Sequence, residues 1–248
     1  HTGGLTVSDT GSISAADLNM INTFKASGTT TATATSEITG SAADIATEIG
    51  LITHNGNVNF TITGVAATIA ELMQINAATS GTIVLSPGTI DRNYSDTAAN
   101  LAAAFEGITT STSTLTIDGT VIATVAELIT INAATSGTVV LNPQTIGTPP
   151  PGTASELAVA FDGITALTGG LTIAGTDPAT VAELMTINAA TSGNVVLNPA
   201  TIAADLSDTA VNLAAAFDGI TTSTSTLTIT GTTPATVAQL ITINAATS

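Results

Sequence analysis

The sequence predicts an α/β repeat fold, a solenoid of about nine strand–helix units with a parallel sheet and helices along one side. Three observations predict it. The motif Glu-Leu-Met-Gln-Ile-Asn-Ala-Ala-Thr-Ser-Gly at Glu71 returns, with small changes, every 56 residues. A second motif, Asp-Thr-Ala-Ala-Asn-Leu-Ala-Ala-Ala-Phe at Asp96, returns with the same period. Short β-rich runs separate the motifs, so one period holds strand, helix, strand and helix.

The repeats cover the whole chain. Fainter copies of the two motifs occupy residues 17–28 and 41–52. We therefore expect residues 1–248 to form a single array. Helices of the first motif should begin near residues 14, 68, 124, 180 and 236, and helices of the second motif near residues 41, 95, 152 and 207.

Each motif is predicted to be helical from its start signal and its apolar spacing. Thr124 and Glu127 have the spacing of a capping box, in which a hydroxyl and a carboxylate bind the free amides of the first turn. In the second motif, Leu101, Phe105 and Ile108 form one apolar stripe. Glycines follow both helices, which favours termination there. They lie at Gly81, Gly137 and Gly193 after the first, and at Gly107, Gly163 and Gly219, where a left-handed cap is expected, after the second.

The runs between the helices are predicted to be short strands. One kind is Leu-Thr-Ile, beginning at Leu115, Leu171 and Leu227, and the other is Val-Val-Leu or its equivalent, beginning at Ile83, Val139 and Val195. Strands joined by helices pair in parallel through right-handed crossovers, which here predicts one continuous sheet.

Composition excludes several classes of function. Two basic residues stand against 18 acidic ones, and a net charge of -16 repels nucleic acid and anionic lipid surfaces. The chain has no cysteine and no uninterrupted run of about 18 apolar residues, so we expect neither disulfides nor a membrane span. Two histidines, His1 and His54, and scattered carboxylates form no singular acid, base and nucleophile cluster, so an enzyme is not expected.

One asparagine recurs in the first motif, at Asn22, Asn76, Asn132, Asn188 and Asn244. Its spacing from the apolar residues of the helix predicts that it points inward. A buried amide needs hydrogen-bond partners, and backbone groups of the neighbouring coil would supply a ladder of them. The alternative is a substrate-binding amide, which would need a pocket beside it.

Calcium is the one cofactor that the sequence allows. Six aspartates are candidate ligands, some of them in loops that offer further oxygen ligands, although no EF-hand loop or glycine-rich nonapeptide array is present. They are Asp91, Asp96, Asp118, Asp177, Asp205 and Asp208.

The outer face of the sheet is a candidate assembly surface. Thr116, Thr172 and Thr228 should point away from the core, with Val84, Val140 and Val196 at the equivalent points of the alternate strands. Apolar strands of this kind are usually covered on both faces, so we expect a cover, either a second layer of the same chain or a neighbouring copy, of which the copy is the more attractive. In addition, a strand over residues 2–7 has no preceding helix and the final helix no following strand, an arrangement that favours head-to-tail stacking.

The string Asp-Thr-Ala-Ala-Asn-Leu-Ala-Ala-Ala-Phe from Asp96, followed by Leu115-Thr116-Ile117, resembles repeats of very large secreted bacterial surface proteins, adhesins and surface-layer-like proteins of the cyanobacterial type. This resemblance implies an extracellular or cell-surface location and a structural or adhesive role. Three functions follow as hypotheses: a self-assembling filament or surface layer, which we favour, an adhesin stalk that spaces a binding domain from the cell, and a threonine-array binder of ice or glycan.

Overall fold

A computed structural model describes residues 3–25, 27–142, 149–164 and 167–247. Strands and helices alternate along this part of the chain, and strands of neighbouring units pair in parallel, which confirms the predicted α/β alternation. Of the strand expected over residues 2–7, the structure shows β1 at Leu5–Thr6, and residue 2 lies outside the described residues. We call each strand–helix unit a coil.

The helices belong to three groups. The long helices, from the first motif, are α1 (Ala15–Phe24), α3 (Ile69–Ala78), α6 (Val125–Ala134), α8 (Val181–Ala190) and α11 (Val237–Ala246). The alanine-rich helices, from the second motif, are α2 (Ala42–Ile49), α5 (Ala98–Phe105), α7 (Ala154–Ala160) and α10 (Ala210–Ala216). Two very short helices that the sequence analysis did not predict are α4 (Pro87–Ile90) and α9 (Pro199–Ala203).

The strands form several small sheets, and the prediction of one continuous sheet was wrong. Two of the interruptions coincide with proline, because Pro87 and Pro199 open the short helices α4 and α9, which stand between β7 and β8 and between β12 and β13, and proline cannot donate to a strand ladder. The sheets are β1–β3–β5 (Leu5–Thr6, Thr30–Ala32, Ile52–His54), β2–β4–β6–β7 (Ser12–Ser14, Glu37–Gly40, Asn59–Ile62, Ile83–Val84), β8–β9–β10 (Tyr94–Asp96, Leu115–Ile117, Val139–Leu141), β11–β12 (Leu171–Thr172, Val195–Val196) and β13–β14 (Leu206–Asp208, Leu227–Ile229).

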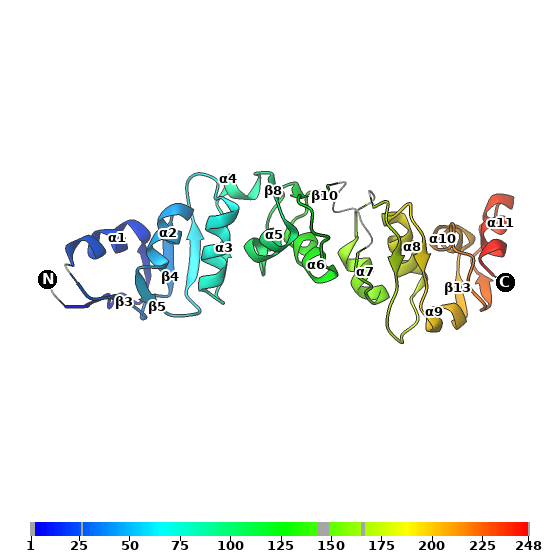
Figure 1. The fold of residues 1–248 in the computed structure, drawn as a ribbon, viewed down its shortest axis with the longest axis horizontal. Coiled ribbons are helices and arrows are strands. Elements are labelled where there is room, and N and C mark those ends of the chain that lie inside the picture. Colours follow the sequence, from blue (N-terminus) through cyan, green and yellow to red (C-terminus); the bar gives the residue numbers. More distant parts are fainter. Residues whose placement is uncertain (1–2, 26, 143–148, 165–166, 248) are drawn as a thin grey trace. The chain divides into compact units, whose positions relative to one another are not determined.

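The chain divides into two compact units, His1–Leu115 with Ala133–Gly137, and Thr116–Asn132 with Thr138–Ser248. In the first unit, α1, α2, α3 and α5 pack against one another in chain order (Figure 1). In the second unit, α7, α8, α10 and α11 do the same. Each coil sends leucine, isoleucine or phenylalanine into the core of its unit, for example Phe60 and Leu101 in the first and Leu184 and Phe217 in the second.

The predicted helix starts are confirmed. At α8, the Thr180 hydroxyl accepts from the amide of Glu183, and the Glu183 carboxylate accepts from the amide of Thr180. The same capping box opens α3 at Thr68 and α7 at Thr153. Two free amides of each first turn are satisfied in this way, so these short helices have fixed starting points.

The two sets of glycines end the helices for different reasons. Gly107, Gly163 and Gly219 have φ angles of 72°, 73° and 75°, the left-handed conformation expected after the alanine-rich helices. Gly81, after a long helix, is not left-handed. A Cβ atom there would lie 2.6 Å from the carbonyl oxygens of Asn57 and Val58, so the close approach of the previous coil requires glycine.

Candidate functional site: the contacts between coils

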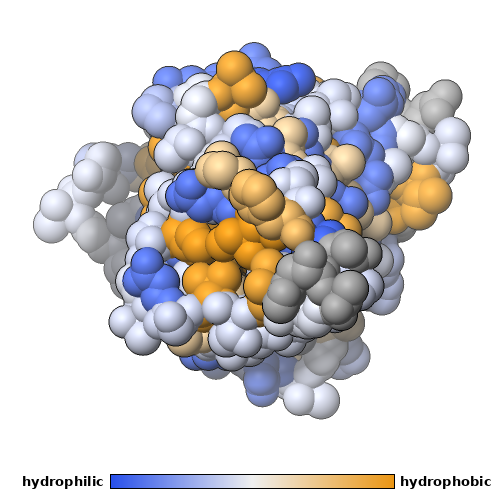
Figure 2. Space-filling model, turned by 90° about the vertical axis from the view of Figure 1, so that its left-hand side faces the viewer, coloured by the Kyte–Doolittle hydropathy of each residue, from blue (hydrophilic) through white to orange (hydrophobic). Residues whose placement is uncertain are grey.

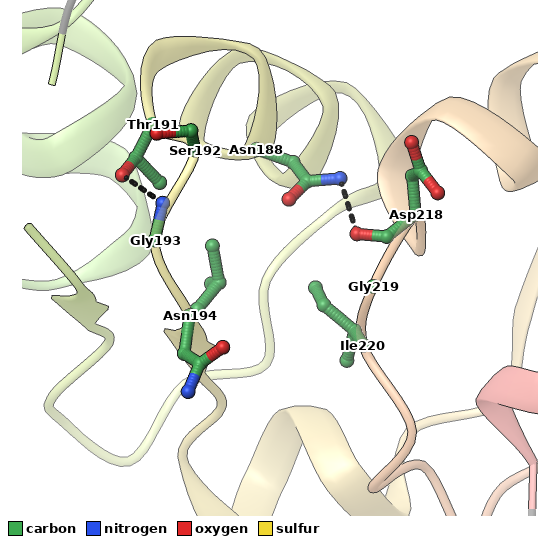
Figure 3. Close-up of a pocket in the computed structure, with 9 residues that line it drawn as sticks. Asn188, Thr191, Ser192, Gly193, Asn194, Asp218, Gly219 and Ile220 are labelled. Carbon is green, nitrogen blue, oxygen red and sulfur yellow. Dashed lines mark hydrogen bonds between the residues drawn. The ribbon is translucent and has the colours of Figure 1, made fainter. Parts of the chain in front are cut away.

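The recurring asparagine joins each long helix to the alanine-rich helix that follows it. The side-chain amide of Asn188 on α8 donates to the carbonyls of Ala215 and Asp218, both at 3.0 Å, at the end of α10. Figure 3 shows the contact with Asp218. The last carbonyls of a helix have no partner within that helix, so this amide satisfies groups that would otherwise need water. The equivalent contacts join Asn76 to Ala103 and Glu106, and Asn132 to Val159 and Asp162.

The asparagines do not point fully inward as the sequence analysis expected. Asn188 is half-buried, and the preceding residue, Ile187, occupies the core position. Because successive residues turn by about 100° around a helix, the amide after a core residue lies at the edge of the core, facing the next helix. The backbone of that next helix is what it binds.

The first and last asparagines of the set have different surroundings. The amide of Asn22 donates to the carboxylate of Glu48, a buried residue of α2, at 2.5 Å, and Asn19 donates to the same carboxylate at 2.9 Å. Lys25 and Thr30 donate to the Asn22 carbonyl oxygen. Asn244 is exposed, and its side chain makes no hydrogen bond within the described residues.

A second polar contact between coils was missed by the sequence analysis. Asn198, only 3% exposed, caps α9, and its amide donates to the carbonyls of Gly175 at 3.1 Å and Asp177 at 2.9 Å in the preceding coil. Thr201, on α9, is fully buried and accepts from the amide of Ala179 at 2.8 Å. The signal was present in the sequence as Asn-Pro-Ala-Thr, a capping residue followed by proline at the first helical position.

The first unit repeats this contact with one change. Ser86 replaces asparagine as the cap of α4, and the buried Thr89 accepts from the amide of Ala67 at 3.0 Å. The short helices therefore bind the loop that precedes a long helix.

A polar hollow of about 270 Å³ lies beside the Asn188 contact. Its wall consists of the turn after α8 and the turn after α10, and in Figure 3 Asn188 spans it toward Asp218. The hydroxyl of Thr191 in the same wall accepts from the amide of Gly193 at 2.9 Å. The polar groups that such a hollow would offer a ligand are thus partly engaged in holding the two coils together.

Each of the six aspartates proposed as calcium ligands accepts a hydrogen bond from another residue of the chain, five through the side chain and Asp177 through its backbone carbonyl. Asp96 and Asp208 accept from the amides of Asn100 and Asn212, each at 2.8 Å, and Asp91 accepts from the Thr112 hydroxyl. The side chain of Asp118 binds Gly119 and Asn142, that of Asp205 binds the amide of Thr226, and the backbone carbonyl of Asp177 binds Asn198. In the described ranges, no three His, Cys, Asp or Glu side chains come together as a metal site.

The candidate assembly face is exposed. Val84, Val140 and Val196 are 50%, 39% and 54% exposed. Val196 lies in register with Thr172, the alternation of valine and threonine that the sequence suggested. Thr116 is half-buried, and Thr228 is exposed beside Ser207. The valines are therefore separated by polar neighbours and do not form one apolar stripe.

Larger apolar side chains lie on the first coil. Met20 and Phe24 of α1 are 54% and 73% exposed. Figure 2 looks at the molecule from the end that carries the N-terminus, and hydrophobic residues gather in the middle of that view with polar residues around them.

Among the described residues, Tyr94 and Glu156 have perturbed pKa values. Burial raises the pKa of Tyr94, whose hydroxyl donates to the carbonyl of Ala67 at 3.0 Å. The amide and hydroxyl of Thr153 lower the pKa of Glu156, which is the carboxylate of a capping box. Both shifts accompany contacts that position a loop or start a helix.

No helix among the described residues is long and apolar enough to cross a membrane. No protein-family model, curated protein or solved structure matches this chain.

Proposed function

We propose that this chain is a structural section of an extracellular filament or surface layer, in which strand–helix coils stack as a solenoid and associate with further coils of the same kind. The observation that supports the proposal most directly is that the repeated polar side chains bind the neighbouring coil. Asn76, Asn132 and Asn188 each bind the end of the next helix. The most regular chemical feature of the sequence thus serves the contact between coils.

The repetition also argues against a catalytic role. Catalysis needs one site with groups of matched function, whereas Asn132 and Asn188 have equivalent partners 56 residues apart. An extracellular location is supported by the resemblance to repeats of secreted surface proteins. It is also supported by the single lysine and single arginine, which leave trypsin-like proteases few sites to cut.

An adhesin stalk is the second candidate. It is favoured by the mixed outer face, where Thr172 lies beside Val196 and the exposed valines are isolated. A surface that associates side by side is usually a contiguous apolar patch. The same mixture weakens the third hypothesis, because an ice- or glycan-binding array of threonines would need hydroxyls on successive strands.

Electron microscopy of the protein purified from its native source, with and without a calcium chelator, tests the proposal. Regular filaments or sheets support it. Isolated particles at high concentration, with a sedimentation coefficient that does not change on further concentration, overturn assembly and leave the stalk. Loss of the filaments or sheets in the chelator would make calcium part of the assembly.

A further inference from the structure

The contact between α1 and α2 departs from the repeat pattern in three residues. Glu48 of α2 is only 1% exposed, and its equivalents in the later alanine-rich helices are the buried alanines Ala104, Ala160 and Ala216. Lys25, the one lysine of the chain, stands where the later coils have Thr79, Thr135 and Thr191. Asn19 stands where they have Met73, Ile129 and Met185. All three departures lie around Asn22, a member of the recurring asparagine set.

The polar atoms of the Asn22 side chain are all engaged by these residues and by Thr30. The Lys25 amine donates to Oδ1 of Asn22 at 2.8 Å, and the hydroxyl of the fully buried Thr30 donates to the same oxygen at 2.6 Å. The Lys25 amine also donates to the Thr30 hydroxyl at 3.2 Å. On the other side of the amide, Nδ2 of Asn22 donates to Oε2 of Glu48, whose Oε1 accepts from Asn19.

This arrangement supplies the groups that acyl transfer requires. A neutral lysine amine is a nucleophile, and the carbonyl carbon of an amide is an electrophile. A C=O bond is about 1.2 Å long, so the Lys25 nitrogen lies within about 4 Å of the Asn22 carbonyl carbon. The Thr30 hydroxyl is directed at the oxygen on which negative charge develops during attack, and such a donor stabilises that charge. The Glu48 carboxylate lies at the nitrogen that would leave.

We propose that Lys25 and Asn22 form an isopeptide bond within the chain, with Glu48 as the proton carrier and Thr30 as the donor to the oxyanion. The Lys25 ammonium first loses a proton to solvent, which reaches this half-buried side chain. The bond from Nζ to Cγ of Asn22 then forms, and the electrons of the C=O double bond move to Oδ1.

Ammonia leaves in the second half of the reaction. As the double bond to Oδ1 forms again, the bond from Cγ to Nδ2 breaks. Both nitrogens are bonded to the same carbon in the intermediate, so Glu48 beside one of them accepts the proton of the attacking nitrogen and passes it to Nδ2. One amide bond forms and one is lost, and the reaction consumes no oxidant or further substrate.

The new bond would close the last turn of α1. Asn22 lies in that turn, and Lys25 is the C-cap residue. The later long helices have threonine at the position of Lys25, so the reaction is specific to the first coil. The bond would also remove one of the two sites at which trypsin can cut, the other being Arg92.

Mass spectrometry and trypsin test the proposal on the full chain, after purification and again after prolonged incubation at neutral pH. We expect the intact, denatured protein to be lighter than its sequence by the mass of one ammonia. Trypsin should then cut the denatured chain after Arg92 and not after Lys25, because an acylated lysine is not recognised. A chain of full mass that trypsin cuts after Lys25 overturns the proposal.

Lys25→Arg is the matched control, since arginine keeps the positive charge and its hydrogen-bond donors but is not an amine nucleophile. This variant should have the full mass of its sequence and be cut at both sites. Loss of ammonia that persists in Lys25→Arg comes from cyclisation of an asparagine elsewhere, such as Asn55 before Gly56, and contradicts the proposal.

Two further variants test the assigned roles. Glu48→Gln keeps the shape of the side chain but cannot carry the proton, and Thr30→Val removes the donor to Oδ1. Each should lower the crosslinked fraction in freshly purified protein, with circular dichroism showing that the fold is kept. A crosslinked fraction equal to that of the unchanged chain in both folded variants overturns the mechanism. None of these readings depends on whether the protein forms filaments.

Discussion

The side-chain amide of Asn188 lies 3.0 Å from the carbonyl oxygen of Asp218, thirty residues further along the chain. Asn132 and Asp162 stand in the same relation at 3.1 Å, and Asn76 and Glu106 at 3.0 Å. In each case one amide satisfies the end of an alanine-rich helix of only seven or eight residues. A helix of that length is marginal by itself, so its end is held by the coil before it.

Replacing Asn188 with leucine should therefore destabilise the second unit. We expect the free energy of unfolding to fall by about 0.5–1.5 kcal/mol, because two carbonyls at the end of α10 lose their donor. Chemical denaturation followed by circular dichroism measures the loss. Asn244→Leu is the matched control, since its amide has no partner in the described chain, and it should change stability by less than about 0.5 kcal/mol. Equal losses in the two variants would show that helix propensity, and not the contact, is responsible.

Gly81→Ala should be poorly tolerated. The new methyl group would lie 2.6 Å from two backbone oxygens of the previous coil, and backbone cannot move aside as a side chain can. Overpacking of this kind costs about 1–3 kcal/mol. Gly56→Ala provides the control, because a Cβ atom at Gly56 meets nothing within 4 Å and the φ angle there is not positive. Thermal unfolding of the two variants checks the difference, and a stability of Gly81→Ala equal to that of Gly56→Ala contradicts it.

Thr201→Val tests the second contact between coils. Valine has almost the same shape as threonine but removes the oxygen that accepts from the amide of Ala179, which is itself buried. A buried amide without a partner costs about 1–3 kcal/mol. The exposed Thr222→Val should leave the unfolding midpoint nearly unchanged. A small effect of Thr201→Val would mean that water reaches the Ala179 amide.

Local features of the fold were predictable from the sequence, and partners distant in the chain were not. Thr180 and Glu183 are three residues apart, so their capping box could be read directly. Asn188 was recognised by its period, but its acceptors lie 27 and 30 residues away, at the end of a helix whose length had first to be known. The prediction of a continuous sheet was wrong at β12 and β13 because Pro199 was not recognised as the start of the short helix α9, which lies between them. Asn-Pro-Ala-Thr carried that signal in full.

The stability of the first unit should fall in alkaline solution through Tyr94, the one tyrosine of the chain. Burial disfavours the phenolate and raises the pKa of Tyr94 above its ordinary value of 10.0, although Arg92 nearby acts in the opposite direction. When the pKa of a group is higher in the folded state than in the unfolded state, the group makes its full contribution to stability at pH values below the unfolded pKa. That contribution is lost as pH rises from about 10 through the folded pKa.

Absorbance near 295 nm reports this ionisation without interference, because the chain has no tryptophan. We expect a titration midpoint above 10 for the folded protein and near 10 in denaturant. Tyr94→Phe is the control, since it removes the titrating group together with the hydrogen bond to the Ala67 carbonyl. Its stability should be lower at neutral pH and less dependent on pH above 10. A folded midpoint at or below 10 would show that the attraction of Arg92 outweighs burial.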